Sequence, residues 1–197
     1  MALQRRISVS YYAGIGSRET PESITDHMSD MAVELYYLGL TLLSGRAEGP
    51  DWAFQRGAEY AMTESGGIVR QQIYLPKDSF NRKFGNIGAR NPQHWSNYSD
   101  AEDIMETLHP KGQYLTGFSR QAHTRNVYQI LGDDLATPVS FVICYAKPLG
   151  KVRVSGGTAT AVALAHRLGI PVYNLYDEKN IEAVYALIKE LKDEASN

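Results

Sequence analysis

Ser8-Val9-Ser10-Tyr11-Tyr12-Ala13-Gly14-Ile15-Gly16-Ser17-Arg18 is the stretch that decides the fold: an apolar, strand-like run that ends in a glycine-rich turn. A second such turn, Ser155-Gly156-Gly157-Thr158, lies near the other end of the chain, again between an apolar run and a helix-like run. In an α/β fold, turns of this kind meet at the carboxyl edge of a parallel sheet, where backbone N–H groups and helix N-termini bind phosphate. The sequence therefore predicts a phosphate or nucleotide site at that edge.

Apolar runs and helical periodicities alternate along the rest of the chain. We expect strands over residues 8–13, 40–44, 68–75, 141–146 and 171–175, and helices over 20–38, 52–62, 120–131, 159–168 and 181–191. Strands that alternate with helices predict an α/β, Rossmann-like, doubly wound and mainly parallel sheet with helices on both faces.

Residues 77–118 interrupt this rhythm and show no clear periodicity apart from a short helical pattern over 100–108. We interpret them as an inserted segment over the carboxyl edge of the sheet, because loops of this length in compact domains are usually functional or mobile. The length of 197 residues predicts a single domain over 1–197.

Composition limits the classes of partner. The net charge of −2 gives no global basic field for nucleic acid, and the single cysteine allows no disulfide framework. The histidines lack metal-ligand spacing, so we expect neither a metal nor a cofactor. No apolar stretch is as long as a membrane span, and the first six residues lack a signal-peptide core, so we expect a cytoplasmic protein without membrane contact.

The first turn supplies four candidate ligand-binding residues. Gly14 and Gly16 remove side-chain bulk, Ser17 offers a hydroxyl, and Arg18 offers a planar cation suited to phosphate. An ordinary strand-to-helix turn with a solvated arginine would have the same sequence. The turn matches neither the three-glycine dinucleotide fingerprint nor a Walker loop.

The loop Ser44-Gly45-Arg46-Ala47-Glu48-Gly49-Pro50-Asp51 is expected at the same edge. Arg46 could face phosphate or pair with Glu48, and Asp51 could cap the following helix or hold a ribose hydroxyl.

Two later segments complete the candidate site. The N–H groups of Gly157, Thr158 and Ala159 would form an anion nest, although an ordinary helix cap by Thr158 is the alternative. The segment His123-Thr124-Arg125-Asn126 offers phosphate and base contacts, or else a solvated helix face. The predicted ligand-binding set is Gly14, Gly16, Ser17, Arg18, Ser44, Gly45, Arg46, Asp51, His123, Arg125, Asn126, Gly156, Gly157 and Thr158.

Together these segments resemble the SLOG superfamily, which includes the DNA-processing protein DprA and the LOG-type phosphoribohydrolases. The first turn looks like the family's Gly-Ser-Arg turn, and residues 43–51 are similar to the DprA Ser-Gly-x-Ala-x-Gly-x-Asp loop. Residues 156–161 resemble the family's last glycine loop, and residues 122–126 resemble the Met-His-x-Arg-Lys helix of LOG enzymes. The resemblance covers residues 9–175 and is closest to small DprA-like proteins of phages and bacteria. It implies a Rossmannoid domain and a homodimer or higher homo-oligomer.

The sequence departs from the hydrolytic branch of that family. LOG enzymes carry a catalytic glutamate soon after the glycine loop, whereas residues 158–163 contain no carboxylate, and Asn126 stands where the family has lysine. The catalytic residues are therefore unassigned, with Glu48 and Asp51 as candidates, and enzymatic activity stays open.

Three functions fit these observations. The favoured one is binding of a nucleotide or nucleotide-derived signalling ligand, such as an ADP-ribose-type molecule or a cyclic nucleotide, with sequestration of a defence signal as one use. The second is cleavage of a nucleotide N-glycosidic bond by a carboxylate with a raised pKa. The third is DprA-like binding of single-stranded DNA in recombination, which needs basic and aromatic residues in a groove; the candidates are Tyr74, Arg82, Lys83, Arg90, Trp95 and Tyr98.

Overall fold

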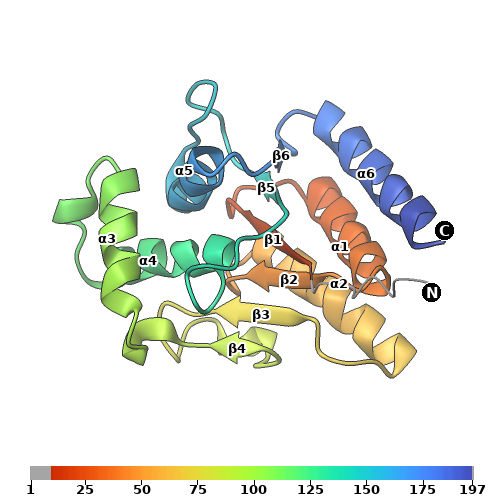
Figure 1. Cartoon of the computed structure of the whole chain (residues 1–197), viewed down its shortest axis with the longest axis horizontal. Helices are drawn as coiled ribbons and strands as arrows, with labels where there is room; N and C mark the ends of the chain where they lie inside the picture. Colours follow the sequence, from red (N-terminus) through yellow and green to blue (C-terminus); the bar gives the residue numbers. More distant parts are fainter. Residues whose placement is uncertain (1–9, 197) are drawn as a thin grey trace, which may run out of the picture.

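A computed structural model describes residues 10–196 and contains one six-stranded sheet (Figure 1). The strands are β1 (Tyr11–Gly16), β2 (Thr41–Ser44), β3 (Gln71–Tyr74), β4 (Ala89–Arg90), β5 (Phe141–Tyr145) and β6 (Val172–Asn174). Their order is β4-β3-β2-β1-β5-β6, and every pairing is parallel. The predicted Rossmann-like α/β fold is confirmed. Ser8 and Val9 of the predicted first strand lie outside the described residues.

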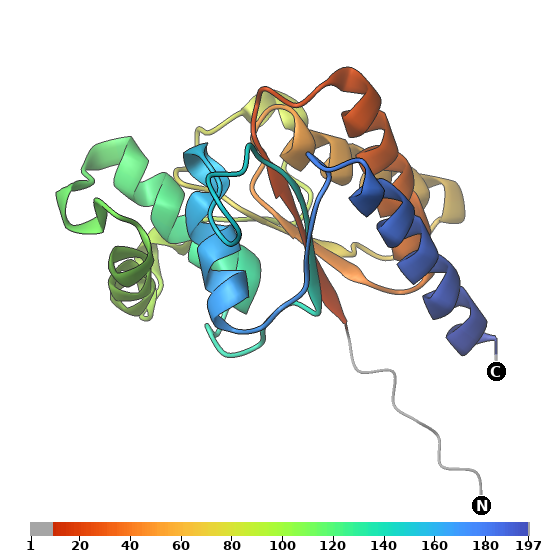
Figure 2. The same cartoon turned by 90° about the horizontal axis from the view of Figure 1, so that it is seen from above.

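Helices cover both faces of the sheet (Figure 2). On one face lie α1 (Glu22–Tyr37), α2 (Pro50–Ser65) and α6 (Lys179–Ala195), which bury Met28, Phe54 and Val184. On the other face lie α3 (Tyr98–Leu108), α4 (Gly117–Leu131) and α5 (Ala159–Arg167), which bury a second apolar cluster around Val127 and Ala161. Within residues 10–196, no helix is both long and apolar enough to cross a bilayer.

Four helices, α2, α3, α4 and α6, begin two or three residues earlier than the sequence pattern predicts. Helix α2 starts at Pro50 rather than residue 52, since proline at a first helical position lacks only an N–H that would be unpaired there. Helix α4 starts at Gly117 rather than residue 120. Thr20 does not cap α1, because its hydroxyl donates to the Ser17 carbonyl at 2.6 Å.

The inserted segment is more regular than predicted. It contributes strand β4, which pairs with β3 through Ile73↔Ala89 and Tyr74↔Arg90, and helix α3, which packs against α4. Short 3₁₀ turns connect these elements: η1 (Arg82–Phe84), η2 (Pro92–His94) and η3 (Gly112–Tyr114). The segment thus extends the sheet at its edge as well as reaching the carboxyl ends of the strands.

The direction in which strands are added to the sheet reverses between β1 and β5: β2, β3 and β4 extend it on one side of β1, and β5 and β6 extend it on the other. The connection that leaves β1 runs through α1 on one face, and the connection that leaves β5 runs through α5 on the other face (Figure 2). Because β1 and β5 are neighbours, their carboxyl ends flank a topological switch point. Open α/β sheets bind ligands in the crevice at such a point.

Candidate functional site

A cavity of about 850 Å³ opens at this switch point, and we refer to it as the switch-point cavity. Its walls come from the segments after β1, β2 and β5, from α4 and from the inserted segment. Its volume falls within the range of about 300–1,000 Å³ that is usual for small-molecule sites. Many predicted site residues, with the catalytic candidate Glu48, line it: Gly16, Ser17, Arg18, Glu48, Asp51, Arg125, Asn126, Gly156, Gly157 and Thr158.

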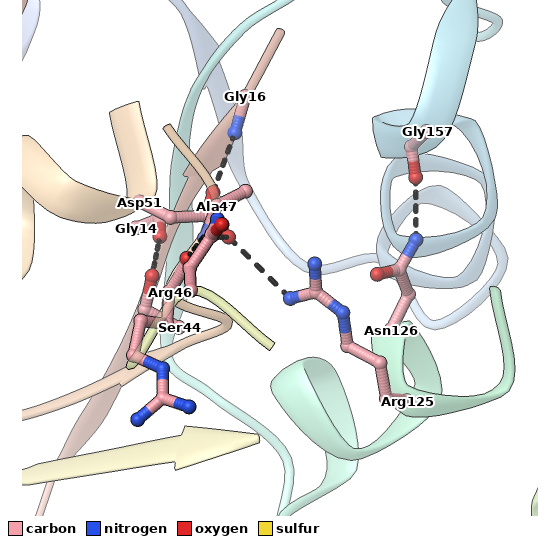
Figure 3. Close-up of polar contacts among 10 residues, drawn as sticks. Gly14, Gly16, Ser44, Arg46, Ala47, Asp51, Arg125, Asn126 and Gly157 are labelled. Atoms are coloured by element: carbon pink, nitrogen blue, oxygen red, sulfur yellow. Dashed lines mark hydrogen bonds and ion pairs between the residues drawn. The ribbon is translucent and has the colours of Figure 1, made fainter. Parts of the chain in front are cut away.

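A buried ion pair lies at the base of the switch-point cavity (Figure 3). Arg125 Nη1 lies 3.4 Å from Asp51 Oδ2, and the two side chains are 9% and 3% exposed. Asp51 also accepts hydrogen bonds from the Gly16 N–H at 3.2 Å and the Ala47 N–H at 3.3 Å. The carboxylate therefore joins α4 to the carboxyl end of β1 and to the loop that follows β2.

The charges of this pair are held in a dry environment. Burial raises the pKa of Asp51 above its ordinary value, and the Arg125 guanidinium is the main opposing influence. Burial likewise lowers the pKa of Arg125, with Asp51 opposing. Arg125 Nε is buried and has no hydrogen-bond partner among residues 10–196. Gln129 orients the guanidinium, because its amide oxygen accepts from Arg125 Nη1 at 2.6 Å and from the Gly45 N–H at 3.1 Å.

The second glycine turn forms the opposite wall of the cavity. Asn126 Nδ2 donates to the Gly157 carbonyl at 2.5 Å, which fixes the turn against α4 (Figure 3). Gly156 has a φ of 76°, and a Cβ at Gly156 or Gly157 would meet nothing within 4 Å. A ligand can therefore approach this backbone closely. The predicted nest is smaller than expected, since the Ala159 N–H donates to the Gly156 carbonyl.

Three predicted residues support the cavity from outside it. The Ser44 hydroxyl donates to the Gly14 carbonyl at 2.6 Å within the buried sheet. A Cβ at Gly14 would lie 2.5 Å from the Phe54 ring, so glycine is required there for core packing rather than for ligand approach. Gly45 likewise leaves room for Arg125, because its Cβ would lie 1.1 Å from Nη1.

Arg46 does not line the cavity, and its side chain does not pair with Glu48. Its left-handed backbone, with a φ of 58°, turns the fully buried side chain away from the cavity and under the inserted segment (Figure 3). There its guanidinium donates to the Gly85 carbonyl at 2.6 Å, to Asn86 Oδ1 at 2.8 Å and to the Phe80 carbonyl. Arg46 thus stabilises the inserted segment from inside the protein, through hydrogen bonds to three of its residues.

The structure places His123 outside the cavity lining and Glu48 within it. His123 packs α4 against α5, with Nδ1 2.8 Å from Thr160 Oγ1, and burial lowers its pKa to about 4. Glu48 does reach the cavity, but its carboxylate lies 2.5 Å from Lys83 Nζ, which lowers its pKa.

The residues predicted to contact single-stranded DNA do not form an exposed stacking surface. The Tyr74 ring is fully buried and meets Trp95 edge-on, with ring centroids 6.3 Å apart. Arg90 forms an ion pair with Asp133, and Lys83 forms one with Glu48 in the loop after β2. The contacts of Trp95, Lys83 and Arg90 thus connect the inserted segment to the rest of the domain.

Several residues that line the cavity were not predicted, above all Phe80, Phe118 and Gln129. One signal could have found part of this set: Phe118, Ala122, Arg125 and Gln129 recur at helical spacing along one side of α4. From His123 to Leu131 this helix is buried all round, so its polar residues must face internal partners or a cavity. Phe80 lies in an aperiodic segment that carries no comparable signal.

Comparison with known proteins adds little to this geometry. No family model matches the sequence, and no curated protein matches it. A similar solved structure is that of DNA processing protein A from Helicobacter pylori, described for its single-stranded DNA binding mode. It is 16% identical with a TM-score of 0.41, and the match covers 92% of this chain and 81% of that chain.

An identity this low concerns the fold alone, and the TM-score carries no argument about ligand or activity. The resemblance to the SLOG superfamily therefore stays a prediction. The fold and the site themselves define a Rossmann-like α/β protein with an open cavity at its switch point and a buried ion pair at the base of that cavity.

Proposed function

We propose that this protein binds a nucleotide or nucleotide-derived signalling ligand, of the ADP-ribose or cyclic-nucleotide type, in the switch-point cavity. The observation that carries the proposal is Arg125, a buried guanidinium at the base of a cavity lined by the glycine-containing end of β1 and by the Gly156-Gly157 turn. In the proposed complex a ligand phosphate lies between Arg125 and the Gly156-Gly157 turn.

The charge balance of the cavity favours an anion. Asp51 contacts the guanidinium through one nitrogen at 3.4 Å, which is longer than a usual charge-assisted hydrogen bond. Arg18 at the rim makes no hydrogen bond or salt bridge within residues 10–196, and the acidic Glu48 beside it is paired with Lys83. A phosphate would therefore contact both Arg125 and Arg18, and it would compete chiefly with the long hydrogen bond between Arg125 and Asp51.

Titration calorimetry with AMP, ADP-ribose and cyclic AMP tests this proposal. Removal of a hydrogen bond to a charged group costs about 1.5–3 kcal/mol, so Arg125→Ala should weaken binding at least tenfold. Arg18→Ala should also weaken binding while leaving stability unchanged, because its side chain is exposed. The matched control is Arg167→Ala, an exposed arginine whose Nη1 contacts Thr107 at 2.9 Å.

The results of that titration separate the proposal from its rivals. Absence of binding to all three probes, or equal affinity for wild type and both site variants, would contradict the proposal. A single-stranded oligodeoxynucleotide added as competitor addresses the DNA-binding alternative. If it bound far more tightly than the small ligands, with the same dependence on Arg125, nucleic acid would replace the signalling molecule as the ligand.

One observation favours a second candidate, cleavage of a nucleotide N-glycosidic bond. Asp51 is a buried carboxyl group with a raised pKa in the lining of the cavity, which is a common property of catalytic acids and bases. Its bonds to Gly16, Ala47 and Arg125 are also explained by a structural role alone. Base release from AMP, measured by chromatography and lost in Asp51→Asn, would promote this candidate; its absence would favour binding without turnover.

Binding without turnover would suit sequestration of a defence signal. We extend the proposal to a homo-oligomer, as the family resemblance implies, and to action in the cytoplasm, as the sequence pattern favours. Native mass spectrometry of freshly purified protein measures both the oligomeric state and any ligand that co-purifies.

A further inference from the structure

We propose that Phe80 and Phe118 form a stacking surface for the nucleobase of the ligand. This inference rests on the proposed function, since it assigns the part of the ligand that lies beyond the phosphate. The two residues come from distant parts of the chain, the segment after β3 and the first turn of α4, and both line the switch-point cavity.

The two rings form one aromatic patch at the cavity. Their centroids are 5.6 Å apart and their planes are tilted by 38°. Phe118 is 46% exposed, and Lys77 Nζ lies 5.5 Å from the centroid of its ring. A large apolar side chain half open to a polar cavity is better stabilised when a flat partner covers it.

The patch is held in place before any ligand arrives. Arg46 donates to the carbonyl of Phe80, and the neighbouring Asn81 donates through Nδ2 to the carbonyl of Arg46 at 2.9 Å. Asn81 itself has a left-handed backbone, with a φ of 45°. This reciprocal contact fixes the position of Phe80, so little conformational entropy is lost when a ring stacks there.

The combination of contacts specifies the chemistry of the ligand. The base of the cavity offers a cation and a glycine turn for phosphate, and the aromatic patch offers π-faces for a planar heterocycle. Stacking on aromatic side chains accepts every nucleobase, because each base has a π-face. The geometry therefore points to a ligand with a base and a phosphate rather than to a sugar phosphate or an inorganic anion.

Binding of two matched probes tests the stacking surface. AMP and ribose 5-phosphate share the sugar and the phosphate, and only AMP carries a base. Wild type should bind AMP at least about tenfold more tightly. Phe118→Ala and Phe118→Leu should both remove that preference and leave the affinity for ribose 5-phosphate unchanged, because leucine keeps apolar area but has no ring. Tyr114→Ala, which removes an aromatic residue that is 81% exposed and outside the cavity lining, is the control and should change neither affinity.

The outcomes distinguish this inference from the proposed function. Equal wild-type affinities for the two probes, both lost in Arg125→Ala, would keep the phosphate site and overturn the stacking surface. Equal weakening of both probes by Phe118→Ala, or full AMP affinity in Phe118→Leu, would also overturn it. Binding of neither AMP nor ribose 5-phosphate by the wild type, with ADP-ribose and cyclic AMP failing too, would overturn both.

Discussion

Replacement of Gly45 by alanine is a direct test of the buried ion pair. Gly45 does not have a positive φ, so its backbone conformation suits alanine. The added methyl group would lie 1.1 Å from Arg125 Nη1 and 2.2 Å from Cζ. The guanidinium must therefore move away, and Asp51 loses its cation without any change to either residue of the pair.

The expected loss of stability follows from that separation. Breaking a buried ion pair by removal of one partner costs about 3–5 kcal/mol. We expect about 3 kcal/mol at pH 7.5, the lower end of that range, because Asp51 keeps its bonds from Gly16 and Ala47 and because Arg125 can turn into the cavity.

The loss should also depend on pH. Burial already raises the pKa of Asp51 in the folded wild type, so the stabilisation from this group is largest at low pH and declines as pH rises through that pKa. Displacement of Arg125 raises the pKa of Asp51 further, so the decline extends to higher pH and the total loss is larger. The difference between wild type and Gly45→Ala should therefore shrink as the pH falls toward about 4, the ordinary pKa of aspartate.

Urea unfolding at pH 4.5 and pH 7.5 measures both effects. Gly157→Ala is the matched control for stability, because its methyl group would meet nothing within 4 Å and its φ is not positive. A Gly45→Ala protein as stable as wild type, or one with the same loss at both pH values, would refute the reasoning.

Three further predictions follow from the packing. Gly157→Ala should weaken AMP binding while changing stability by no more than about 0.5 kcal/mol, since its methyl group occupies the space for ligand; unchanged affinity in calorimetry would contradict this. Gly14→Ala should lower the free energy of unfolding by about 1–3 kcal/mol, because its Cβ would lie 2.5 Å from the Phe54 ring; a wild-type urea midpoint would argue against it. Arg46→Met should speed amide hydrogen exchange across residues 80–86, and exchange at the wild-type rate would rule out its supporting role.

The fold could be predicted from the sequence because its main signals are local. Apolar runs mark β1 and β5, glycines mark the end of β1 and the turn before α5, and periodic apolar residues mark the helices. Strand β4 could not be predicted, since its two residues are too few to show alternation and their pairing with β3 depends on tertiary contacts.

The candidate site was predictable by segment but not always by side chain. Arg125 and Asp51 were found because each belongs to a polar segment at the expected edge of the sheet. The direction of the Arg46 side chain could not be predicted, because it depends on a left-handed backbone that no local pattern indicates. Phe80 was missed because its position at the cavity is set by contacts with that arginine, from a distant part of the chain.

The pairing of β1 with β5 has a consequence for how the binding site comes into existence. Tyr12 pairs with Phe141 and Gly16 with Tyr145, so the two central strands are brought together from opposite halves of the sequence. Contacts between such distant residues carry a large loop-closure entropy and raise the contact order, which slows folding. Each half of the chain alone lacks one wall of the cavity, so capture of a ligand during refolding would report that the longest-range strand pairing has formed.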